Sequence, residues 1–261
     1  MIDLHTHILP GIDDGPPTLE EGLALARATV SAGVSAVAAT PHVSARYPNA
    51  PATVRRVLRA MRAALSKEGV ALAVHPGAEL ELERAVSLSD DDLRGLRLGG
   101  GPYLLLECPL SPASGDVEPL VSAIRDRGHE VLLAHPERSP VFQRDPDQLE
   151  RLIAHGALTS LTAGAVGGRF GERAHRLAVH LLEEGLAHNL VSDMHDRRGR
   201  PPGILPGLGP DVARVFGLEA SLDWLTRDVP AAILEGQQIP QGPAVGRRPP
   251  ARRAFWRRAA R

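Results

Sequence analysis

The segment Val131-Leu132-Leu133-Ala134-His135-Pro136-Glu137-Arg138 joins a short apolar run directly to a histidine. A continuous apolar run of this length is typical of a buried strand in a parallel sheet. Such runs recur along the chain, each followed by turn residues and a helical pattern, and they decide the fold class. They cover residues 2–4, 35–39, 71–74, 103–106, 131–134, 158–161 and 190–191.

Amphipathic helical patterns separate these runs. Thr18 followed by Glu21 forms a capping box that begins a helix ending near residue 32, just before Gly33. The other helices are predicted over residues 51–68, 117–127, 146–155 and 170–185, which end at Gly69, Gly128, Gly156 and Gly185. Seven strand–helix repeats predict an α/β fold with a parallel sheet, either open or closed into a barrel.

Histidines and acids follow nearly every predicted strand. In a closed barrel all strand C-termini meet on one face, whereas the outer strands of an open sheet could not reach a common site. We therefore predict a distorted TIM-like (β/α)7 barrel of parallel strands with a metal site at the strand C-terminal ends. The residues that follow the strands are His5, His7, His42, Glu79, Glu107, His135, Asp193 and His195.

The bulk composition is that of an ordinary globular protein. Of the 261 residues, 43% are hydrophobic and 23% charged. This length favours one large domain, which we place in residues 1–238. No apolar run approaches the ~20 residues of a membrane-spanning helix, no secretion signal begins the chain, and the single Cys108 fits a reducing compartment. We expect a cytoplasmic protein.

Residues 239–261 form a basic tail. They contain seven arginines and no acid, and because the whole chain carries −1, this +7 leaves −8 on residues 1–238. An acidic body offers no basic face for nucleic-acid phosphates, so we expect no nucleic-acid partner. The tail is predicted to be flexible. From Arg247 to Arg261 it is either a solubilising extension or a peripheral contact with the anionic inner membrane face.

The pair His5-Thr6-His7 is the first chemical signal. Alternate residues of a strand point the same way, so both imidazoles can reach one ion. Imidazoles and carboxylates together suit divalent manganese, iron or zinc. Clustered carboxylates repel by roughly 4 kcal/mol per close pair at an effective dielectric of 20, and bound cations would relieve this repulsion. The histidines predicted not to be ligands are His75, His129, His155, His175, His180 and His188.

Several motifs resemble the PHP (polymerase and histidinol phosphatase) family, and within it the bacterial tyrosine-protein phosphatases of capsule and exopolysaccharide loci. The resemblance runs from Met1 to about residue 237. It departs from the family at Val43, where a histidine is common, and at Ala165, where a serine is common. The motifs are His5-Thr6-His7, Asp13-Asp14-Gly15, Thr40-Pro41-His42, Gly77-Ala78-Glu79, His135-Pro136-Glu137-Arg138, Thr162-Ala163-Gly164, Phe170-Gly171, Ser192-Asp193-Met194-His195 and Arg200-Pro201-Pro202.

The resemblance implies three divalent ions per chain, with manganese favoured and iron, zinc, magnesium or cobalt as alternatives. One ion would be held by His5, His7, Glu79 and Asp193. The second would be held by Glu79, Glu107 and His135, so that Glu79 bridges the two. Asp14, His42 and His195 would hold the third. Adjacent Asp13 could replace Asp14, and the sequence alone does not choose between them.

The same resemblance implies that a metal-activated hydroxide hydrolyses phosphotyrosine. Arg138 and Arg200 would clamp the phosphate, since a guanidinium donates two parallel hydrogen bonds and stays charged; the alternative for each is a surface salt bridge. His42 or Asp193 would supply a proton. The expected substrate is a membrane-associated bacterial tyrosine kinase that controls capsule or exopolysaccharide synthesis. The sequence does not decide whether the protein forms an oligomer. Two alternatives remain: a phosphatase for a small ester such as histidinol phosphate, and a non-catalytic metal-binding regulator.

Overall fold

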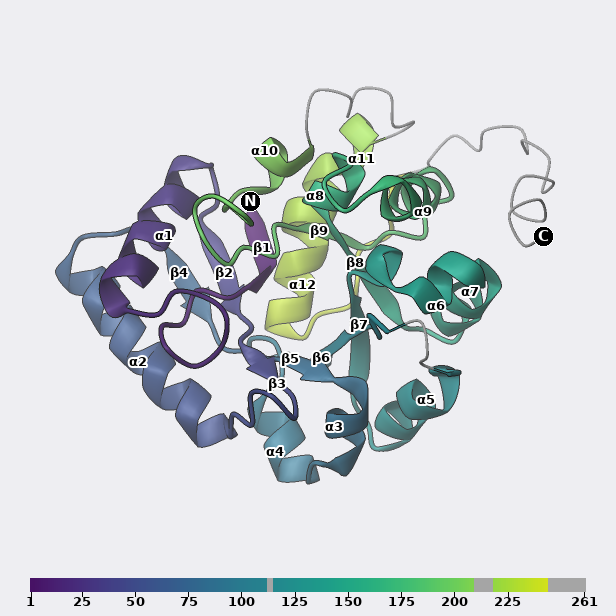
Figure 1. The fold of residues 1–261 in the computed structure, drawn as a ribbon, viewed down its shortest axis with the longest axis horizontal. Helices are drawn as coiled ribbons and strands as arrows, with labels where there is room; N and C mark the ends of the chain where they lie inside the picture. The colour runs from purple at the N-terminus through teal and green to yellow at the C-terminus, as the bar shows by residue number, and fades with distance from the viewer. Residues whose placement is uncertain (112–114, 209–217, 244–261) are drawn as a thin grey trace.

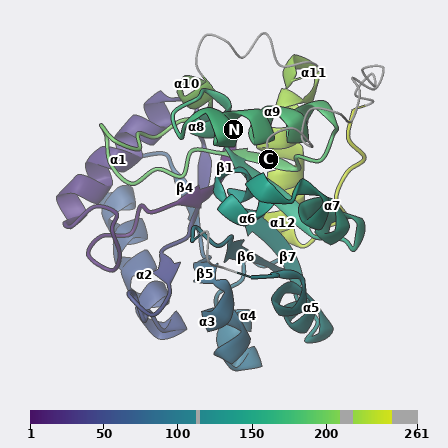
Figure 2. The same ribbon diagram turned by 45° about the vertical axis from the view of Figure 1, so that its right-hand side comes forward.

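The computed structural model describes residues 1–111, 115–208 and 218–243, in which parallel strands at the centre are surrounded by helices (Figures 1 and 2). The α/β class with parallel strands is confirmed, because every strand pairing in these residues is parallel. The strands are β1 (Ile2–Thr6), β2 (Ala36–Ala39), β3 (His42–Val43), β4 (Ala73–His75), β5 (Glu79–Glu81), β6 (Tyr103–Glu107), β7 (Glu130–Ala134), β8 (Leu158–Thr162) and β9 (Asn189–Val191).

The five helices predicted from the sequence are present, each within two residues of its predicted bounds. Thr18 caps the first of them, because its side chain accepts a hydrogen bond from the Glu21 amide at 3.3 Å. The glycine that ends each helix has a positive φ, between 63° and 93°, which glycine adopts without steric cost. These helices are α1 (Leu19–Ser31), α2 (Pro51–Lys67), α5 (Glu118–Asp126), α7 (Pro146–Ala154) and α9 (Glu172–Glu183).

Shorter helices fill the remaining connections and were not predicted. Two turns of other types accompany them: a 3-10 turn at Pro136–Arg138 and a π-helical turn at Trp224–Asp228. None of the helices in the described part of the chain is both long and apolar enough to cross a membrane. The additional α-helices are α3 (Leu82–Ser87), α4 (Asp90–Gly95), α6 (Pro140–Arg144), α8 (Ala163–Val166), α10 (Ile204–Leu208), α11 (Leu218–Asp223) and α12 (Val229–Glu235).

The strands pair into two sheets, in the orders β1-β2-β4 and β3-β5-β6-β7-β8-β9. Two of the seven predicted strands, 35–39 and 71–74, are each followed by a short strand that was not predicted: β3 follows β2 after Pro41, and β5 follows β4 after Pro76. Proline lacks the N–H that a ladder needs, so pairing stops there and resumes in the second sheet. Hydrogen-bonded pairing in the described residues therefore does not establish one continuous closed barrel.

The sheets also approach each other beside β1 and β9. Asp193 N donates to His5 O at 3.2 Å, and His7 N donates to Met194 O at 2.9 Å. A single parallel bridge joins Thr6 to Met194. These contacts bring the C-terminal ends of strands from both sheets to one region, which is what the predicted site requires.

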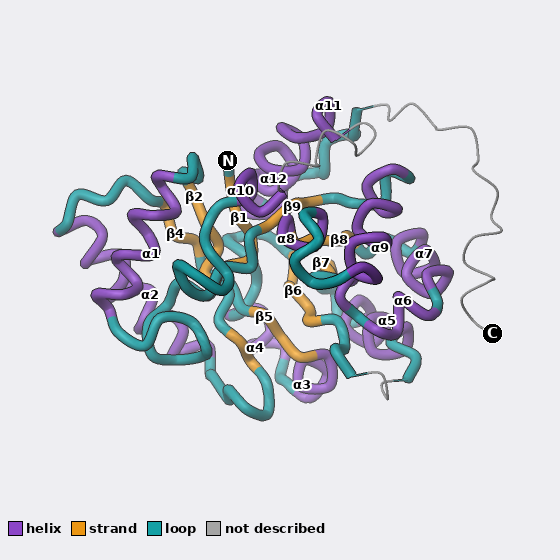
Figure 3. Tube along the Cα trace, turned by 45° about the horizontal axis from the view of Figure 1, so that its top comes forward, coloured by secondary structure: helices purple, strands orange, loops and turns teal. Residues whose placement is uncertain are grey.

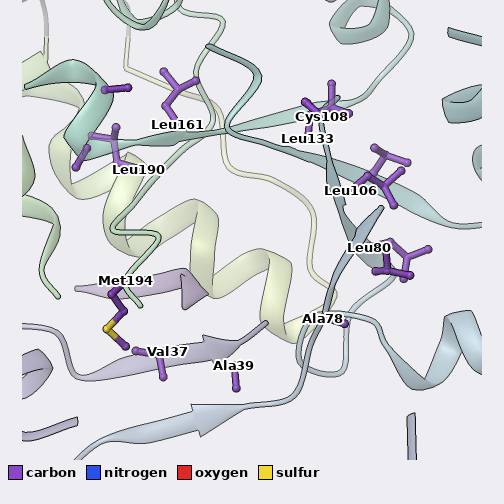
Figure 4. Close-up of a cluster of buried hydrophobic side chains, with 14 of the residues drawn as sticks. Val37, Ala39, Ala78, Leu80, Leu106, Cys108, Leu133, Leu161, Leu190 and Met194 are labelled. Carbon is purple, nitrogen blue, oxygen red and sulfur yellow. The ribbon is translucent and has the colours of Figure 1, made fainter. Parts of the chain in front are cut away.

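Alternate side chains of the strands enter two apolar clusters. In β6, Leu104 and Leu106 pack in the larger cluster beneath the outer helices, whereas Leu105 packs in a second cluster. The second cluster joins both sheets to α12, since it contains Leu4 of β1 as well as Ile233. Figure 3 shows the strands at the centre with helices on both sides, and Figure 4 shows side chains of the larger cluster. This packing holds the strand ends in place.

Candidate metal centre

The nine side chains predicted as metal ligands lie together at the C-terminal ends of the strands. Six of them are at or next to a strand end or the start of β3 or β5. Asp193 and His195 follow the end of β9 by two and four residues, and Asp14 comes from the loop between β1 and α1. Each belongs to at least one group of three or four residues whose ligand atoms lie within 4.8 Å of one another. The groups are His7/Asp14/His42/His195, His5/His7/Asp193, His5/Glu79/His135 and His42/Glu79/Glu107.

Glu79 occupies the centre of the cluster. Its Oε2 lies 3.1 Å from His5 Nε2, 3.3 Å from His7 Nε2 and 3.1 Å from His42 Nδ1. Its Oε1 lies 2.8 Å from His135 Nε2. Both oxygens of one buried carboxylate are thus shared among four imidazoles, an arrangement that suits a ligand common to two ions.

The groups overlap with the expected ligand sets without matching all of them. The set Asp14, His42 and His195 falls within one group, which His7 joins. Glu107 and His135 were expected on the same ion, but they fall in different groups. Glu79 belongs to both of these groups and so links Glu107 to His135.

The donor chemistry fits divalent ions. Buried polar atoms in proteins nearly always have a partner. Within the described residues, four buried atoms of this cluster make no well-aligned hydrogen bond: His5 Nδ1, Glu79 Oε2, His135 Nδ1 and His195 Nε2. Two of them, Glu79 Oε2 and His195 Nε2, nevertheless lie near groups that can carry the opposite charge. Mixed imidazole and carboxylate donors, three or four to a group, are the coordination that zinc, manganese and iron take in proteins.

Burial and the crowding of charges shift the pKa values of several predicted ligands. Burial, reinforced by the Glu79 carboxylate, raises the pKa of Glu107 to about 8. Burial alone would also raise the pKa of Asp193, but His5 and Arg138 hold it well below its usual range. Burial, with Arg138 beside it, lowers the pKa of His135 to about 4. Metals bind neutral imidazoles and ionised carboxylates, which are the states of His135 and Asp193 at neutral pH, whereas Glu107 would lose its proton when an ion binds.

Arg138 and Arg200 lie at the edge of this cluster. Arg138 Nη1 donates to Asp193 Oδ2 at 2.5 Å, and Arg200 Nη1 lies 3.4 Å from the same oxygen. Arg200 Nη2 also donates to Asp14 Oδ2 at 3.2 Å. Both arginines therefore make salt bridges, but with acids of the metal cluster rather than with acids elsewhere on the surface.

Phe170 contacts Arg138, and it also lines a small hollow. The Arg138 guanidinium carbon is 4.3 Å from the centroid of the Phe170 ring, in the range of a cation–π contact. The hollow is lined by Phe170, Arg200, Ser192 and Gly164, among others. A larger hollow lies at α2 and β4. Neither hollow is lined by a predicted metal ligand, and of the two only the first is lined by a predicted phosphate-binding arginine, Arg200.

Comparison with known proteins identifies the family. The model for capsular polysaccharide synthesis proteins, CpsB/CapC, matches residues 1–235. This chain is a member of the CpsB/CapC family. The tyrosine-protein phosphatase YwqE of Bacillus subtilis is 33% identical to it over 201 residues, or 77% of this chain and 79% of YwqE.

Other CpsB/CapC relatives agree. Tyrosine-protein phosphatase CpsB of Streptococcus agalactiae is 28% identical over 231 residues, which are 84% of this chain and 92% of that protein. A crystal structure from a study of Bacillus subtilis YwqE and Streptococcus pneumoniae CpsB, described as unique metal-dependent tyrosine phosphatases, matches with a TM-score of 0.80 and 31% identity. It covers 93% of this chain and 97% of that one. The resemblance inferred from the motifs is confirmed.

The structure of this CpsB/CapC protein distinguishes Asp13 from Asp14, between which the sequence did not choose a ligand. Asp14 lies in a candidate ion group, with Oδ1 3.2 Å from His195 Nε2. Asp13 lies in no such group among the described residues, and its Oδ2 is 2.8 Å from His7 Nδ1. The geometry favours Asp14 as the ligand and gives Asp13 the part of orienting an imidazole.

Two further contacts in this family member escaped the sequence analysis. The Tyr47 ring stacks on His42 with centroids 5.7 Å apart, and Phe170 was noted only as part of a motif. A tyrosine five residues beyond a predicted ligand carries no local signal of contact. None of the histidines predicted to be non-ligands belongs to a candidate ion group in the described residues.

Proposed function

We propose that this CpsB/CapC family protein is a metal-dependent protein-tyrosine phosphatase. The observation that carries the proposal is the position of two guanidinium groups at the edge of a nine-residue cluster of metal-ligating side chains. Divalent ions and arginines together attract a phosphate dianion and stabilise the charge that develops on it. Relatives 28% and 33% identical are named tyrosine-protein phosphatases, which supports phosphotyrosine as the substrate.

We propose that these residues hold three ions, with manganese preferred. His5, His7, Glu79 and Asp193 would hold the first, Glu79, Glu107 and His135 the second, and Asp14, His42 and His195 the third. When bound, the ions supply Lewis-acid charge and lower the pKa of a water molecule so that hydroxide is available near neutral pH. We also propose that the strands form a distorted seven-stranded barrel, because a barrel brings the C-terminal ends of its strands to one face.

The chain's own residues bind and orient the phosphate. Arg138 and Arg200 share Asp193 Oδ2 as an acceptor, so both guanidinium groups point to one place. An arriving phosphate would take over some of these hydrogen bonds as bidentate contacts. His42, whose side chain is 15% exposed, or Asp193 would hold the transferred proton. Tyrosinate, with a pKa near ~10, leaves with little help from a general acid.

The substrate proposed is a phosphotyrosine protein, specifically a membrane-associated bacterial tyrosine kinase. The family description links CpsB/CapC proteins to capsular polysaccharide synthesis. Residues 1–238 would form the catalytic domain of a cytoplasmic enzyme, and the basic tail would place it at the inner membrane face. Residues 244–261, which include Arg247 to Arg261, lie outside the described part of the chain.

Vesicle pelleting tests the membrane contact. Trp224 Nε1 donates to Pro240 O at 2.9 Å, so a chain that ends after residue 243 keeps this contact. The full chain should pellet with anionic vesicles, because each arginine near the headgroups contributes about 1 kcal/mol. The shortened chain should stay in the supernatant, and neither chain should pellet with neutral vesicles. Equal pelleting of the two chains would exclude the tail contact.

A substrate comparison tests the activity. With manganese present, the protein should hydrolyse a phosphotyrosyl peptide faster than a phosphoseryl peptide or histidinol phosphate. Faster turnover of histidinol phosphate would instead support a small-ester phosphatase. Failure to hydrolyse any phosphomonoester, p-nitrophenyl phosphate included, would support a non-catalytic metal-binding regulator.

A further inference from the structure

Two residues of the metal cluster have left-handed backbone. His135 has φ 36° and ψ 52°, and Asp193 has φ 53°. They are the non-glycine residues with positive φ in the described part of the chain. L-residues pay a steric cost in this region, so the surroundings must hold them there. Both are proposed ligands, and a relaxed backbone would point each side chain elsewhere.

A buried glutamate fixes the chain next to His135. Glu137 is 0% exposed, and its Oε1 accepts hydrogen bonds from Thr162 N at 2.9 Å and Thr162 Oγ1 at 2.7 Å. Thr162 is the last residue of β8, the strand beside β7. The glutamate thus ties the turn after His135 to a neighbouring strand. Gln143 Nε2 adds a bond of 2.8 Å to the Glu137 carbonyl oxygen.

A buried aspartate fixes the chain next to Asp193. Asp3 of β1 is 0% exposed, and both of its carboxylate oxygens lie 3.2 Å from Ser192 N. Its Oδ1 also accepts from His5 N at 3.2 Å. Ser192 directly precedes Asp193, so Asp3 holds β1 and the segment after β9 together at the left-handed residue. Neither Asp3 nor Glu137 belongs to a candidate ion group in residues 1–111, 115–208 and 218–243.

We infer that Asp3 and Glu137 are positioning residues, whose carboxylates hold Asp193 and His135 in the left-handed backbone that aims both side chains at the metals. They act through backbone and threonine donors rather than by touching an ion or the substrate. The inference rests on the metal site of the proposed function and adds the two carboxylates that shape it. Removing either should loosen a ligand and leave the rest of the fold assembled.

Metal affinity provides the test. Glu137→Met removes the oxygen that accepts both hydrogen bonds from Thr162, whereas Glu137→Gln retains an oxygen that can accept both. Manganese titration by calorimetry, well below the unfolding temperature, should show roughly 10–100-fold weaker binding for Glu137→Met, the usual effect of losing an outer partner of a ligand. Glu137→Gln should restore most of the affinity. Asp3→Asn, which turns one acceptor into a donor facing the Ser192 amide, should also weaken binding.

Thr159→Val is the matched control. Thr159 is a buried threonine on the same strand as Thr162, but its hydroxyl donates to Leu186 O, away from the ligands. This variant should lower the unfolding temperature in chelator without changing manganese affinity. If Glu137→Met does not fold, Thr162→Val replaces it, because it removes only the hydroxyl bond. Thr162→Val should weaken manganese binding more than Thr159→Val at a comparable loss of stability.

The outcomes separate this inference from the proposed activity. The positioning role would be overturned if the Asp3 variant and the Glu137 or Thr162 variant bind manganese as tightly as Thr159→Val does. This holds whatever the enzyme hydrolyses. A wild-type protein that binds manganese but hydrolyses no phosphotyrosine would remove the proposed function. The affinities of the variants would still decide whether the two carboxylates shape the site.

Discussion

Asp13 Oδ2 lies 2.8 Å from His7 Nδ1, and the Asp13 side chain is completely buried. The same carboxylate accepts hydrogen bonds from the Gly15 amide at 2.9 Å and the His42 amide at 3.2 Å. The adjacent Asp14 side chain is 35% exposed and faces His195 instead. Although burial opposes it, contact with His7 lowers the pKa of Asp13, so the acid that orients His7 stays ionised.

Asp13→Asn should weaken manganese binding roughly 10–100-fold, as expected when a partner that orients a metal-ligating histidine loses its charge. The amide keeps an oxygen for the Gly15 amide, so the loop should remain folded. Asp14→Asn is the comparison, since it alters a proposed ligand and should abolish binding of one ion. Titration calorimetry with an elemental count of bound metal distinguishes the two. A missing ion in Asp13→Asn and none missing in Asp14→Asn would reverse the assignment.

Arg138→Lys and Arg200→Lys should each reduce kcat/KM for a phosphotyrosyl peptide by about 10–100-fold. Lysine keeps the charge but loses the planar fork, and hydrogen bonds to charged groups contribute about 1.5–3 kcal/mol. Arg151→Lys is the control, because Arg151 Nε donates to Glu118 Oε1 at the surface, and Arg151 does not line the hollow that contains Arg200. Steady-state kinetics measures the effect. A loss in the control as large as in the other two variants would contradict the clamp.

Phe170→Leu should raise KM a few-fold with little change in kcat. The ring lies 4.3 Å from the Arg138 guanidinium carbon, and an exposed cation–π contact contributes about 0.5–1 kcal/mol. Combining the change with Arg138→Lys provides a double-mutant cycle. The effect of Phe170→Leu should shrink when Arg138 is already lysine. Strictly additive effects would mean that Phe170 acts independently of Arg138.

His188 should make the fold less stable at mildly acidic pH. Burial lowers its pKa from 6.5 to about 4. Between these values the unfolded chain binds a proton that the folded chain does not, so stability falls as the pH drops from 6.5 towards 4. The loss at pH 5 is at most about 2 kcal/mol. Urea unfolding at pH 7.5 and pH 5 should show a smaller loss for His188→Gln than for the wild type, and equal losses would contradict the assignment.

Metal removal should lower the unfolding temperature as well as the activity. Ions that bind only the folded state stabilise it, by about 2.7 kcal/mol when their concentration is 100 times the dissociation constant. Thermal unfolding with chelator and with added manganese measures the difference. Glu79→Gln, altered at the centre of the cluster, should show little response to manganese. A wild type that unfolds at the same temperature in both conditions would argue against a metal centre.

Local sequence patterns were sufficient to predict the longer helices. The capping box at Thr18 and the glycines after five helices set bounds that the structure reproduces within two residues. The short strands β3 and β5 were missed, because two or three residues after a proline carry no periodicity to detect. The closed barrel was inferred from convergence of ligands, and convergence does not require an unbroken ladder. The two sheets meet at β1 and β9 through a few backbone bonds instead.

By itself, the sequence determined which side chains end the strands, since strand–helix alternation and residue type are local properties. Through the resemblance of its motifs to a family, it also predicted nine metal ligands and two phosphate-binding arginines, and the comparisons confirmed the family. Only the tertiary structure decided that Glu79 contacts four imidazoles, that Asp13 orients His7 while Asp14 faces the cluster, and that His135 and Asp193 have left-handed backbone. These relations depend on backbone contacts between residues as far apart as His5 and Asp193, and no local pattern encodes such contacts.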